Sequence, residues 1–491
     1  MVTSVESSVP ARAKYEPVIG LEVHVQLLTA SKIFCSCSTR FGDPPNTNVC
    51  PVCLGLPGAL PVLNRKAVEF ATLAAMALNC EIRETSIFAR KNYFYPDLPK
   101  GYQISQYDKP LAEHGFIEIV TGSGMKRVGI TRVHIEEDAG KSLHDGFVGA
   151  GETTAIDLNR SGVPLIEIVS EPDIATPDEA YEYLTRLKEI ILYTGVSDVN
   201  MEEGSLRCDA NVSVRPRGQK AFGTKTEVKN VNSFRFIREA LQYEIERQVE
   251  VIEGGGKITQ ETRLYNSIEG KTYSMRSKEQ AHDYRYFPEP DLLPLVVDEK
   301  WRAEIRHTLP ELPEARRKRM MADYGITAQD AHTLTLTRSL ADQFESAAKA
   351  AKNPKRVANL VQSELMGRLK AKGLEIEKSP ISMKGLAMAA DLVESGAISG
   401  KMLKDLFDLC FERGKDFPEV YEEEGRPAQS RDTSAIEKIL DEVIAANPKQ
   451  VEQYRAGKKT VSQFFVGQVM RLSKGQANPQ LVNELVTKKL D

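Results

Sequence analysis

The sequence predicts an α+β fold, in which a largely antiparallel sheet with flanking helices is followed by all-α regions. Before about residue 300, segments with period-two alternation follow one another with few helical interruptions. Beyond that point, apolar residues recur at helical spacing almost throughout. Strands in runs, with helices set to the side, favour α+β over a doubly wound α/β fold.

Each predicted element follows from local patterning. The predicted strands are residues 18–27, 116–120, 128–136, 164–170, 205–214 and 223–230. The helices among them are 67–78, rich in alanine, and 176–194, which opens with Thr-Pro and acids. Later helices are expected at 313–324, 339–351, 354–372, 382–395 and 399–412. Residues 416–432, rich in Glu, Gly and Pro, look like a boundary, and two last helices should start at Thr460 and Asn478.

Composition limits the class of protein. The 491 residues are 41% hydrophobic and 27% charged, with a net charge of −4, as in an ordinary globular protein of several domains. Any contact with nucleic acid therefore needs a local basic patch. No apolar run approaches the roughly 18 residues of a membrane span. Residues 1–14 are polar and predict a disordered leader, and seven cysteines, four of them clustered, favour a cytoplasmic protein.

The first strand has one polar and one apolar face. Alternation places Glu22, His24 and Gln26 together on one side. A carboxylate beside an imidazole on a rigid strand can hold a hard cation or move a proton. An ordinary half-exposed strand would show the same alternation, so this pattern alone leaves both interpretations open.

Four cysteines form two short pairs, Cys35-x-Cys37 and Cys50-x-x-Cys53, separated by a loop that contains Gly, Pro and Asn. Such spacing suits a tetrahedral thiolate site, and four sulfur ligands leave no open position, which favours structural zinc over catalytic zinc. Four buried cysteines without metal, or a redox pair, are the alternatives. The isolated cysteines 80, 208 and 410 are expected in the core.

Further acids and bases lie on later strands. Three consecutive acids, Glu136, Glu137 and Asp138, end one strand; such a cluster is often a solvated turn, and if buried it needs a cation. Parity does not decide which of Glu136 and Glu137 faces a site, because the strand can end or bulge there. Two further strands place these polar groups on one face each: Arg207, Asp209 and Asn211, then Lys225, Glu227 and Lys229. Mixed charges suit a phosphate with Mg²⁺, or simply a solvated surface.

Neither a P-loop nor a G-x-S-x-G elbow is found in the sequence. Two loops, residues 90–103 and 282–291, interleave aromatic rings with Lys and Arg. Such rings can stack on unpaired bases, or pack as buried Pro-rich loops. From residue 455 onward seven bases face two acids, a local net charge of +5 that suits a phosphate backbone, although solvated helix faces would look similar. The bases considered for RNA contact are Arg455, Lys458, Lys459, Arg471 and Lys474.

Long motifs then indicate a family. They are GLEVHVQL, CSC…CPVC, RKNYFYPDLPKGYQISQYD, HIEEDAGK, DLNRSGVPLIEIVSEPD, MEEGSLRCDANVS, DYRYFPEPDLLPL and VGQVMRLSKGQANPQLVNELV. Together they resemble the B subunit of the aspartyl/glutamyl-tRNA amidotransferases, from about residue 15 to the end. The resemblance implies ATP and Mg²⁺, an amidase A subunit that releases ammonia, a small C subunit, and Glu-tRNA(Gln) or Asp-tRNA(Asn) as substrate. The side-chain carboxylate is phosphorylated and then amidated by ammonia from an internal tunnel.

The resemblance also implies domains and residue roles. Residues 15–300 match the cradle domain with its kinase and transamidase site, 301–415 a helical domain, and 416–491 a tail that contacts tRNA. Carried over, the catalytic residues are Glu22, His24, Glu137 and Glu227, the last three as Mg²⁺ ligands. Candidates for substrate or ATP contact are Glu136, Asp138, Arg207, Asp209, Asn211, Lys91, Tyr93, Tyr95 and Tyr102. The four cysteines match the zinc-bearing members, and residues 144–154 look like a surface insertion.

Two other hypotheses remain open from the sequence. A non-catalytic tRNA-binding scaffold would use the acidic strands only structurally, and a metal-dependent hydrolase would have no use for the basic tail.

Overall fold

The computed structural model describes residues 14–147, 150–275, 284–426, 433–473 and 477–490. The chain divides into two compact units, Met1–Leu312 and Pro313–Asp491. The predicted leader lies outside the described residues except for its last residue, Lys14. Within the described ranges, no helix has the length and apolar character needed to cross a bilayer.

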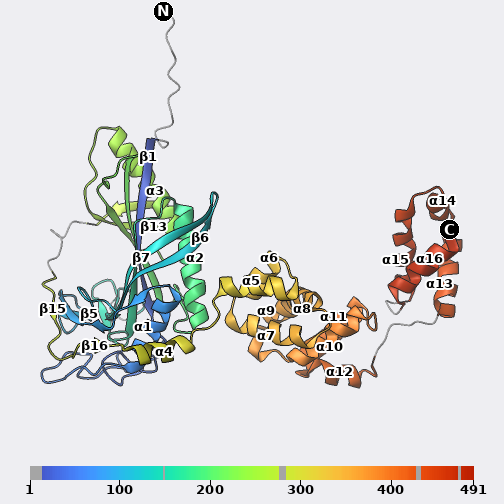
Figure 1. Ribbon diagram of the computed structural model, residues 1–491, viewed down its shortest axis with the longest axis horizontal. Helices are drawn as coiled ribbons and strands as arrows, with labels where there is room; N and C mark the ends of the chain where they lie inside the picture. Colours follow the sequence, from blue (N-terminus) through green and yellow to red (C-terminus); the bar gives the residue numbers. More distant parts are fainter. Residues whose placement is uncertain (1–13, 148–149, 276–283, 427–432, 474–476, 491) are drawn as a thin grey trace, which may run out of the picture. The chain divides into compact units, whose positions relative to one another are not determined.

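A nine-stranded sheet forms the frame of the first unit. Its central strand is β1 (Tyr15–Gln26), labelled in Figure 1. This strand runs antiparallel to β10 (Pro164–Ser170) on one side and to β11 (Leu206–Pro216) on the other. Beyond β10 lie β7 (Gly124–Glu137), β6 (Ala112–Thr121) and β2 (Glu81–Ile82). Beyond β11 lie β12 (Thr226–Lys229), β13 (Thr262–Asn266) and β14 (Lys271–Ser274). Only β12 and β13 pair in parallel among these strands, so the predicted antiparallel α+β architecture is confirmed.

Helices cover the apolar face of this sheet. Leu21, Val23 and Val25 of β1 are buried there, as their alternation predicts. They share one core with residues of α1 (Arg65–Ala77), α2 (Pro177–Thr194) and α3 (Phe234–Glu253). The hydroxyl of Thr176 accepts a hydrogen bond from Glu179 N at 3.1 Å, which confirms the predicted start of α2.

Helix α3 was not predicted from the sequence. Its signals are a Ser233 cap, whose hydroxyl accepts from Phe236 N, and buried Ile237, Leu241 and Ile245 at helical spacing. Many charged residues between these positions hid that spacing. The helix packs on β11 and therefore supports the strand that carries Arg207 and Asp209.

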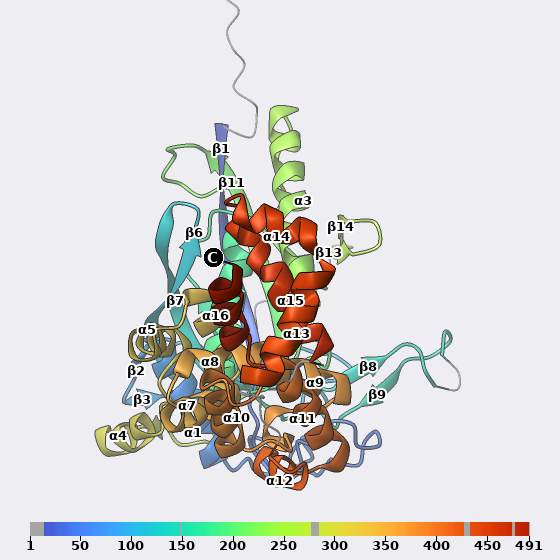
Figure 2. The ribbon, with the colours of Figure 1, turned by 90° about the vertical axis from the view of Figure 1, so that its right-hand side faces the viewer.

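The described part of the first unit also contains three smaller sheets. The strands β15 (Phe287–Pro288), β4 (Ala89–Asn92) and β5 (Tyr102–Ser105) form one of them. The strands β16 (Leu295–Val296) and β3 (Thr85–Ser86) form the second. A projecting ribbon of β8 (Lys141–Leu143) and β9 (Ala155–Asp157) flanks the predicted insertion at 144–154 (Figure 2). Helix α4 (Glu299–His307) packs on α1, where Arg65 Cζ lies 4.3 Å from the centre of the Trp301 ring.

The second unit is helical, as predicted. A first core spans residues 320–421 and a second spans residues 436–490. The helices of the first are α5 (Pro313–Tyr324), α6 (Ala328–Leu334), α7 (Arg338–Ala350), α8 (Pro354–Leu360), α9 (Met366–Lys372), α10 (Met383–Glu394), α11 (Gly400–Arg413) and α12 (Phe417–Glu423). A π-helical turn, Val361–Leu365, joins α8 to α9, and a short 3-10 helix, Ile376–Lys378, follows them.

Four more helices surround the second core. They are α13 (Thr433–Ala446), α14 (Pro448–Arg455), α15 (Ser462–Leu472) and α16 (Pro479–Leu490). The side chain of Asn478 accepts from the backbone N–H groups of residues 480 and 481, which confirms the predicted start of α16. The predicted start at Thr460 is wrong, because Thr460 lies inside a 3-10 helix, Lys459–Val461, and α15 begins without a side-chain cap.

Candidate functional site

A buried acid–imidazole cluster lies at the centre of the polar face of the sheet. In the strand register His24 of β1 faces Glu167 of β10, which in turn faces His134 of β7. Directly opposed residues project to the same side, so the three side chains meet. His24 Nε2 lies 3.2 Å from Glu167 Oε2 and 3.8 Å from Glu136 Oε1. His134 Nε2 lies 3.7 Å from Glu167 Oε2 and 3.6 Å from Glu136 Oε2.

The cluster favours positive charge between its carboxylates. Burial lowers the pKa of His24, but the hydrogen bond to Glu167 and the charges of Glu136 and Glu167 outweigh it and raise the pKa above the usual value. Burial raises the pKa of Glu167, but the charge of His134 and the contact with His24 hold it well below its usual range. One donor atom from each of His24, Glu136 and Glu167 can be chosen so that all three lie within 4.8 Å of one another, a grouping suited to a metal ion.

A second polar network adjoins the first on β1, β11 and β12. Asn211 Nδ2 donates to Glu22 Oε1 at 2.9 Å. Lys229 Nζ contacts Asp209 Oδ2 at 2.7 Å and Glu227 Oε1 at 3.2 Å. Burial lowers the pKa of Lys229, but the two carboxylates raise it above its ordinary value. Burial, followed by the charges of Glu167 and Glu227, raises the pKa of Glu22, so this carboxylate is sensitive to both groups of acids.

A third polar group on this face of the sheet is centred on Asp138. Arg207 Nη2 donates to Asp138 Oδ1 at 2.8 Å, and Gln26 Nε2 donates to Asp138 Oδ2 at 2.7 Å. Arg160 Nε lies 3.7 Å from Asp138 Oδ2. Burial raises the pKa of Asp138, but the two guanidinium groups lower it below its usual value. Asp138 therefore orients Arg207, whose side chain remains partly exposed toward the face.

Glu137 lies away from this cluster, although the sequence could not separate it from Glu136. Its carboxylate pairs with Lys100 and accepts a hydrogen bond from Ile104 N at 2.8 Å. Its carbonyl oxygen accepts from Gln103 Nε2 at 2.6 Å. The side chain thus faces β5 and lines a cavity of about 300 Å³ that the cysteine loop also borders. Among the two acids, the structure brings Glu136 to His24.

The four cysteines converge as their spacing predicts. Their sulfur atoms lie within 4.8 Å of one another, and Cys50 Sγ is 3.8 Å from Cys53 Sγ. A hydrogen bond from Cys35 outweighs burial and lowers the pKa of Cys53 to about 4, with the charge of Lys32 acting in the same direction. Lys32 is buried and donates to Asn48 O at 2.7 Å, which holds the loop between the two pairs. The donor set fits a tetrahedral metal site.

The aromatic-basic loops form a wall beside the acid–imidazole cluster. Lys91 Nζ lies 4.9 Å from the ring centre of Tyr284, and its charge is among those that lower the pKa of Glu167. Tyr93 packs edge-on against both Tyr284 and the exposed Tyr95. Tyr102 lies between two cations, 4.2 Å from Arg90 Cζ and 5.3 Å from Lys100 Nζ. The aromatic side chains of this wall are thus neither all buried nor all exposed to solvent. Residues 282–283 of the second loop lie outside the described chain.

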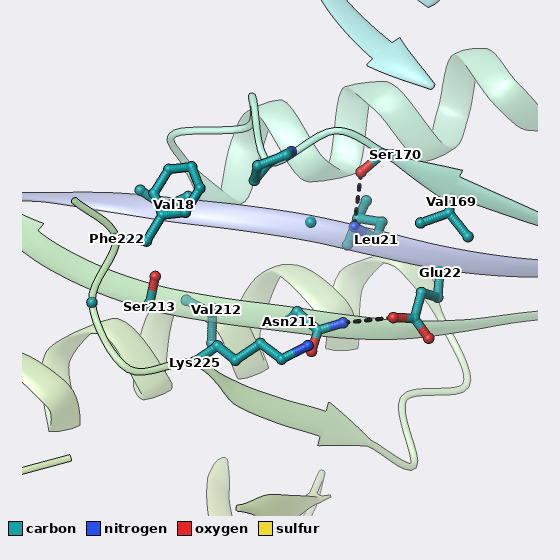
Figure 3. Close-up of a pocket in the computed structure, with 13 residues that line it drawn as sticks. Val18, Leu21, Glu22, Val169, Ser170, Asn211, Val212, Ser213, Phe222 and Lys225 are labelled. Atoms are coloured by element: carbon teal, nitrogen blue, oxygen red, sulfur yellow. Dashed lines mark hydrogen bonds between the residues drawn. The ribbon is translucent and has the colours of Figure 1, made fainter. Parts of the chain in front are cut away.

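A cavity of about 370 Å³ continues the polar face from Glu22 toward the start of β1. Figure 3 shows Val18 and Phe222 at one end of this cavity and Glu22, bound by Asn211, at the other. Phe222 is 61% exposed, and Lys225 of the same loop also lines the cavity. One end is therefore apolar, and the other carries an amide and a carboxylate.

Four of the five predicted basic residues of the tail lie in the described chain and are solvent-accessible. Arg455, Lys458, Lys459 and Arg471 are all exposed, and Lys459 Nζ lies 4.1 Å from the centre of the Tyr454 ring. Lys474 lies outside the described residues.

Two site residues, Glu167 and His134, were missed as candidates. Glu167 is the only charged residue in the strand PLIEIVS, and it is buried. A single acid in an otherwise apolar, buried strand needs a charged or hydrogen-bonding partner in the fold. This isolated acid is the sequence feature that could have identified Glu167 as a site residue. His134 lies at the start of the acidic motif, but its role depends on strand register.

Comparison with known proteins first identifies the class. The GatB/GatE catalytic domain model matches residues 17–303, which carry the sheet, the acid–imidazole cluster and the cysteines. The GatB domain model matches residues 342–490. These features define a GatB/GatE-type catalytic subunit.

Relatives then give the particular family. The chain is 59% identical over 477 residues to the B subunit of the aspartyl/glutamyl-tRNA(Asn/Gln) amidotransferase of Carboxydothermus hydrogenoformans, covering 97% of this chain and 99% of the relative. It is 57% identical over 478 residues to the B subunit of the same amidotransferase of Geotalea uraniireducens, covering 97% and 100%. The chain belongs to the GatB family of amidotransferase subunits.

Proposed function

We propose that this chain is the subunit of a tRNA-dependent amidotransferase that activates the side-chain carboxylate of Glu-tRNA(Gln), Asp-tRNA(Asn) or both, and then converts it to the amide. It would work with an amidase A subunit and a small C subunit. The observation that carries the proposal is the buried cluster of His24, Glu136 and Glu167 on a face that also presents Arg207 and Lys229. Anion-binding cations beside a cation-binding cluster suit phosphoryl transfer.

The chemistry has two steps. A carboxylate oxygen of the charged amino acid attacks the γ-phosphorus of ATP, and ADP leaves. Ammonia from the amidase partner then attacks the acyl carbon of the acyl phosphate; phosphate leaves with the bonding electrons, and a proton is lost. A free carboxylate is a poor electrophile, and phosphorylation supplies the leaving group. Because an acyl phosphate hydrolyses readily, the polar face must be covered during turnover.

The acid–imidazole cluster fits a divalent cation. Its donors are close together, and the raised pKa of His24 indicates that the two carboxylates already favour one positive charge there. Mg²⁺ would offset repulsion between the triphosphate and the substrate carboxylate. We therefore propose His24 with Glu136 and Glu167 as the ligand set. Of the other acids expected from the resemblance, Glu227 lies in the adjoining network with Glu22, and Glu137 pairs with Lys100.

Other residues would position the anionic substrates. Arg207, oriented by Asp138, and Lys229, oriented by Asp209, present cations to phosphate oxygens. The cavity beside Glu22 suits the nucleoside of ATP, because Phe222 offers an exposed ring at its far end. Separately, the cysteine cluster suits structural Zn²⁺, which would hold the loop beside Glu137.

The test is ATP turnover and amide formation by the co-purified complex, with and without charged tRNA. Wild type should need charged tRNA and Mg²⁺. Glu136→Gln should abolish amide formation and spare glutamine hydrolysis by the partner. Glu118→Gln removes an exposed acid from β6 of the same sheet and should have no effect.

Unchanged ATP turnover in Glu136→Gln would leave this chain as a tRNA-binding scaffold. Loss of both activities in a folded complex would equally contradict the assignment.

A further inference from the structure

Five tyrosines form a continuous aromatic ladder along the wall of the site. Tyr95 packs edge-on against Tyr93, Tyr93 against Tyr284, and Tyr284 against Tyr286, with centroid distances of 6.4, 6.1 and 6.0 Å. The contact between Tyr286 and Tyr107 has a different geometry. Tyr286 and Tyr107 are stacked face to face, with 4.1 Å between ring centroids and 7° between ring planes. The ladder therefore ends in a parallel stack, the geometry that a nucleobase can extend.

Tyr107 is the open end of that stack. One face of its ring is covered by Tyr286, yet the residue is 52% exposed. About half of the Tyr107 surface therefore stays open to solvent although Tyr286 covers one side of its ring. Tyr286 is half-buried and supports the outer ring from behind.

The segment that carries Tyr107 is anchored to the reaction centre. Two residues earlier, the hydroxyl of Ser105 donates to Glu136 Oε2 at 3.3 Å. The intervening residue, Gln106, is buried, and its Oε1 accepts from Ile135 N of β7 at 3.1 Å. The charges of Glu136 and Glu167, after burial, raise the pKa of the Tyr286 hydroxyl. The hydrogen bonds of Ser105 and Gln106 thus fix the start of the stack's segment next to Glu136 and β7.

The substrate itself requires a binding surface at this place. In an aminoacyl-tRNA the amino acid is esterified to the ribose of the 3′-terminal nucleotide. Only a few bonds separate that ribose from the side-chain carboxylate that must reach the cluster. The unpaired terminal base must therefore lie near His24 and Glu136, where an exposed aromatic face can stack on it.

We propose that Tyr107, supported by Tyr286, is the platform on which the 3′-terminal base of the charged tRNA stacks, so that the amino acid is directed to the acid–imidazole cluster. The inference rests on the proposed function. Tyr107 would be a substrate-positioning residue, and it would affect the use of tRNA and leave the use of ATP unchanged.

The test uses the co-purified complex and two measurements. In Tyr107→Leu, kcat/KM for charged tRNA should fall about 5- to 150-fold, the factor that corresponds to ~1–3 kcal/mol of base–aromatic stacking. The KM for ATP should not change, and the rate of glutamine hydrolysis by the partner should not change either. With 2-aminopurine as the 3′-terminal base of the tRNA, binding should quench its fluorescence in wild type, and Tyr107→Leu should remove the quenching.

Matched variants separate stacking from folding. Tyr107→Phe and Tyr107→Trp retain an aromatic face and should keep both the kcat/KM for charged tRNA and the fluorescence quenching. These two variants also test the proposal if Tyr107→Leu alone is unstable. Tyr273→Leu removes a comparably exposed ring on β14 and should act like wild type. An unchanged kcat/KM in folded Tyr107→Leu, or no quenching in wild type, overturns the stacking proposal. Absence of any amide formation by wild type would instead overturn the proposed function.

Discussion

Replacing Lys100 by methionine isolates the electrostatic part of one buried contact. The side chains of Lys100 and Glu137 are 6% and 3% exposed, and they pair directly. Methionine keeps most of the apolar length of lysine and removes the ammonium. The variant therefore leaves a buried carboxylate that has lost its counter-charge; within the described chain, it keeps the hydrogen bond from Ile104 N.

The expected loss of stability follows from that geometry. Removing one partner of a buried ion pair costs ~3–5 kcal/mol. The remaining hydrogen bond favours the lower value, about 3 kcal/mol. At ~2.1 cal/mol/K per residue, a unit of roughly 300 residues has an unfolding entropy of about 0.6 kcal/mol/K. The melting temperature of the first unit should therefore fall by about 5 °C.

Scanning calorimetry of the full chain measures this change. Lys100→Met/Glu137→Gln removes both charges and should recover most of the loss. Lys126→Met breaks a more exposed pair with Glu179 and should cost less than ~1 kcal/mol. Equal losses of stability in Lys100→Met and Lys126→Met would contradict a strong buried pair between Lys100 and Glu137. If Glu137→Gln also abolished amide formation, the metal-ligand role that the family resemblance implies would return to Glu137.

Three further predictions follow from other parts of the molecule. Arg207→Ala should move acid unfolding, followed by circular dichroism, to higher pH. The folded-state pKa of Asp138 is lowered, so ionised Asp138 stabilises the fold above about pH 4, and this stabilisation is lost as the pH falls through the folded-state pKa. Removing Arg207 raises that pKa, so the loss begins at a higher pH. An acid transition at the wild-type pH in Arg207→Ala would contradict this prediction. Cys50→Ser should remove bound zinc, measured by elemental analysis, whereas Cys80→Ser outside the cluster should retain it; equal zinc in both variants would exclude the cluster. Arg471→Ala should weaken tRNA binding at low salt and reduce the slope of log K against log salt by about 1, and an unchanged slope would remove Arg471 from the RNA contact.

Local sequence patterns were sufficient for much of the fold. Period-two alternation predicted β1 and the strand with Arg207, because a strand with one buried face must alternate. The spacing of the four cysteines predicted their convergence, because two short chelating pairs need only one turn between them. Thr176 and Asn478 marked helix starts because a capping side chain bonds to its own first turn. Thr460 failed because a 3-10 helix precedes α15.

Local patterns therefore specify the face on which each side chain lies, since alternation and capping depend on neighbours in the chain. Which faces meet depends on pairing between strands that are distant in the chain. Glu167 reaches His24 through a pairing between strands about 140 residues apart, and Tyr107 reaches Tyr286 across an even longer separation. Such registers are set by the burial of the whole sheet, because a one-residue shift would turn every side chain of a strand to the other face.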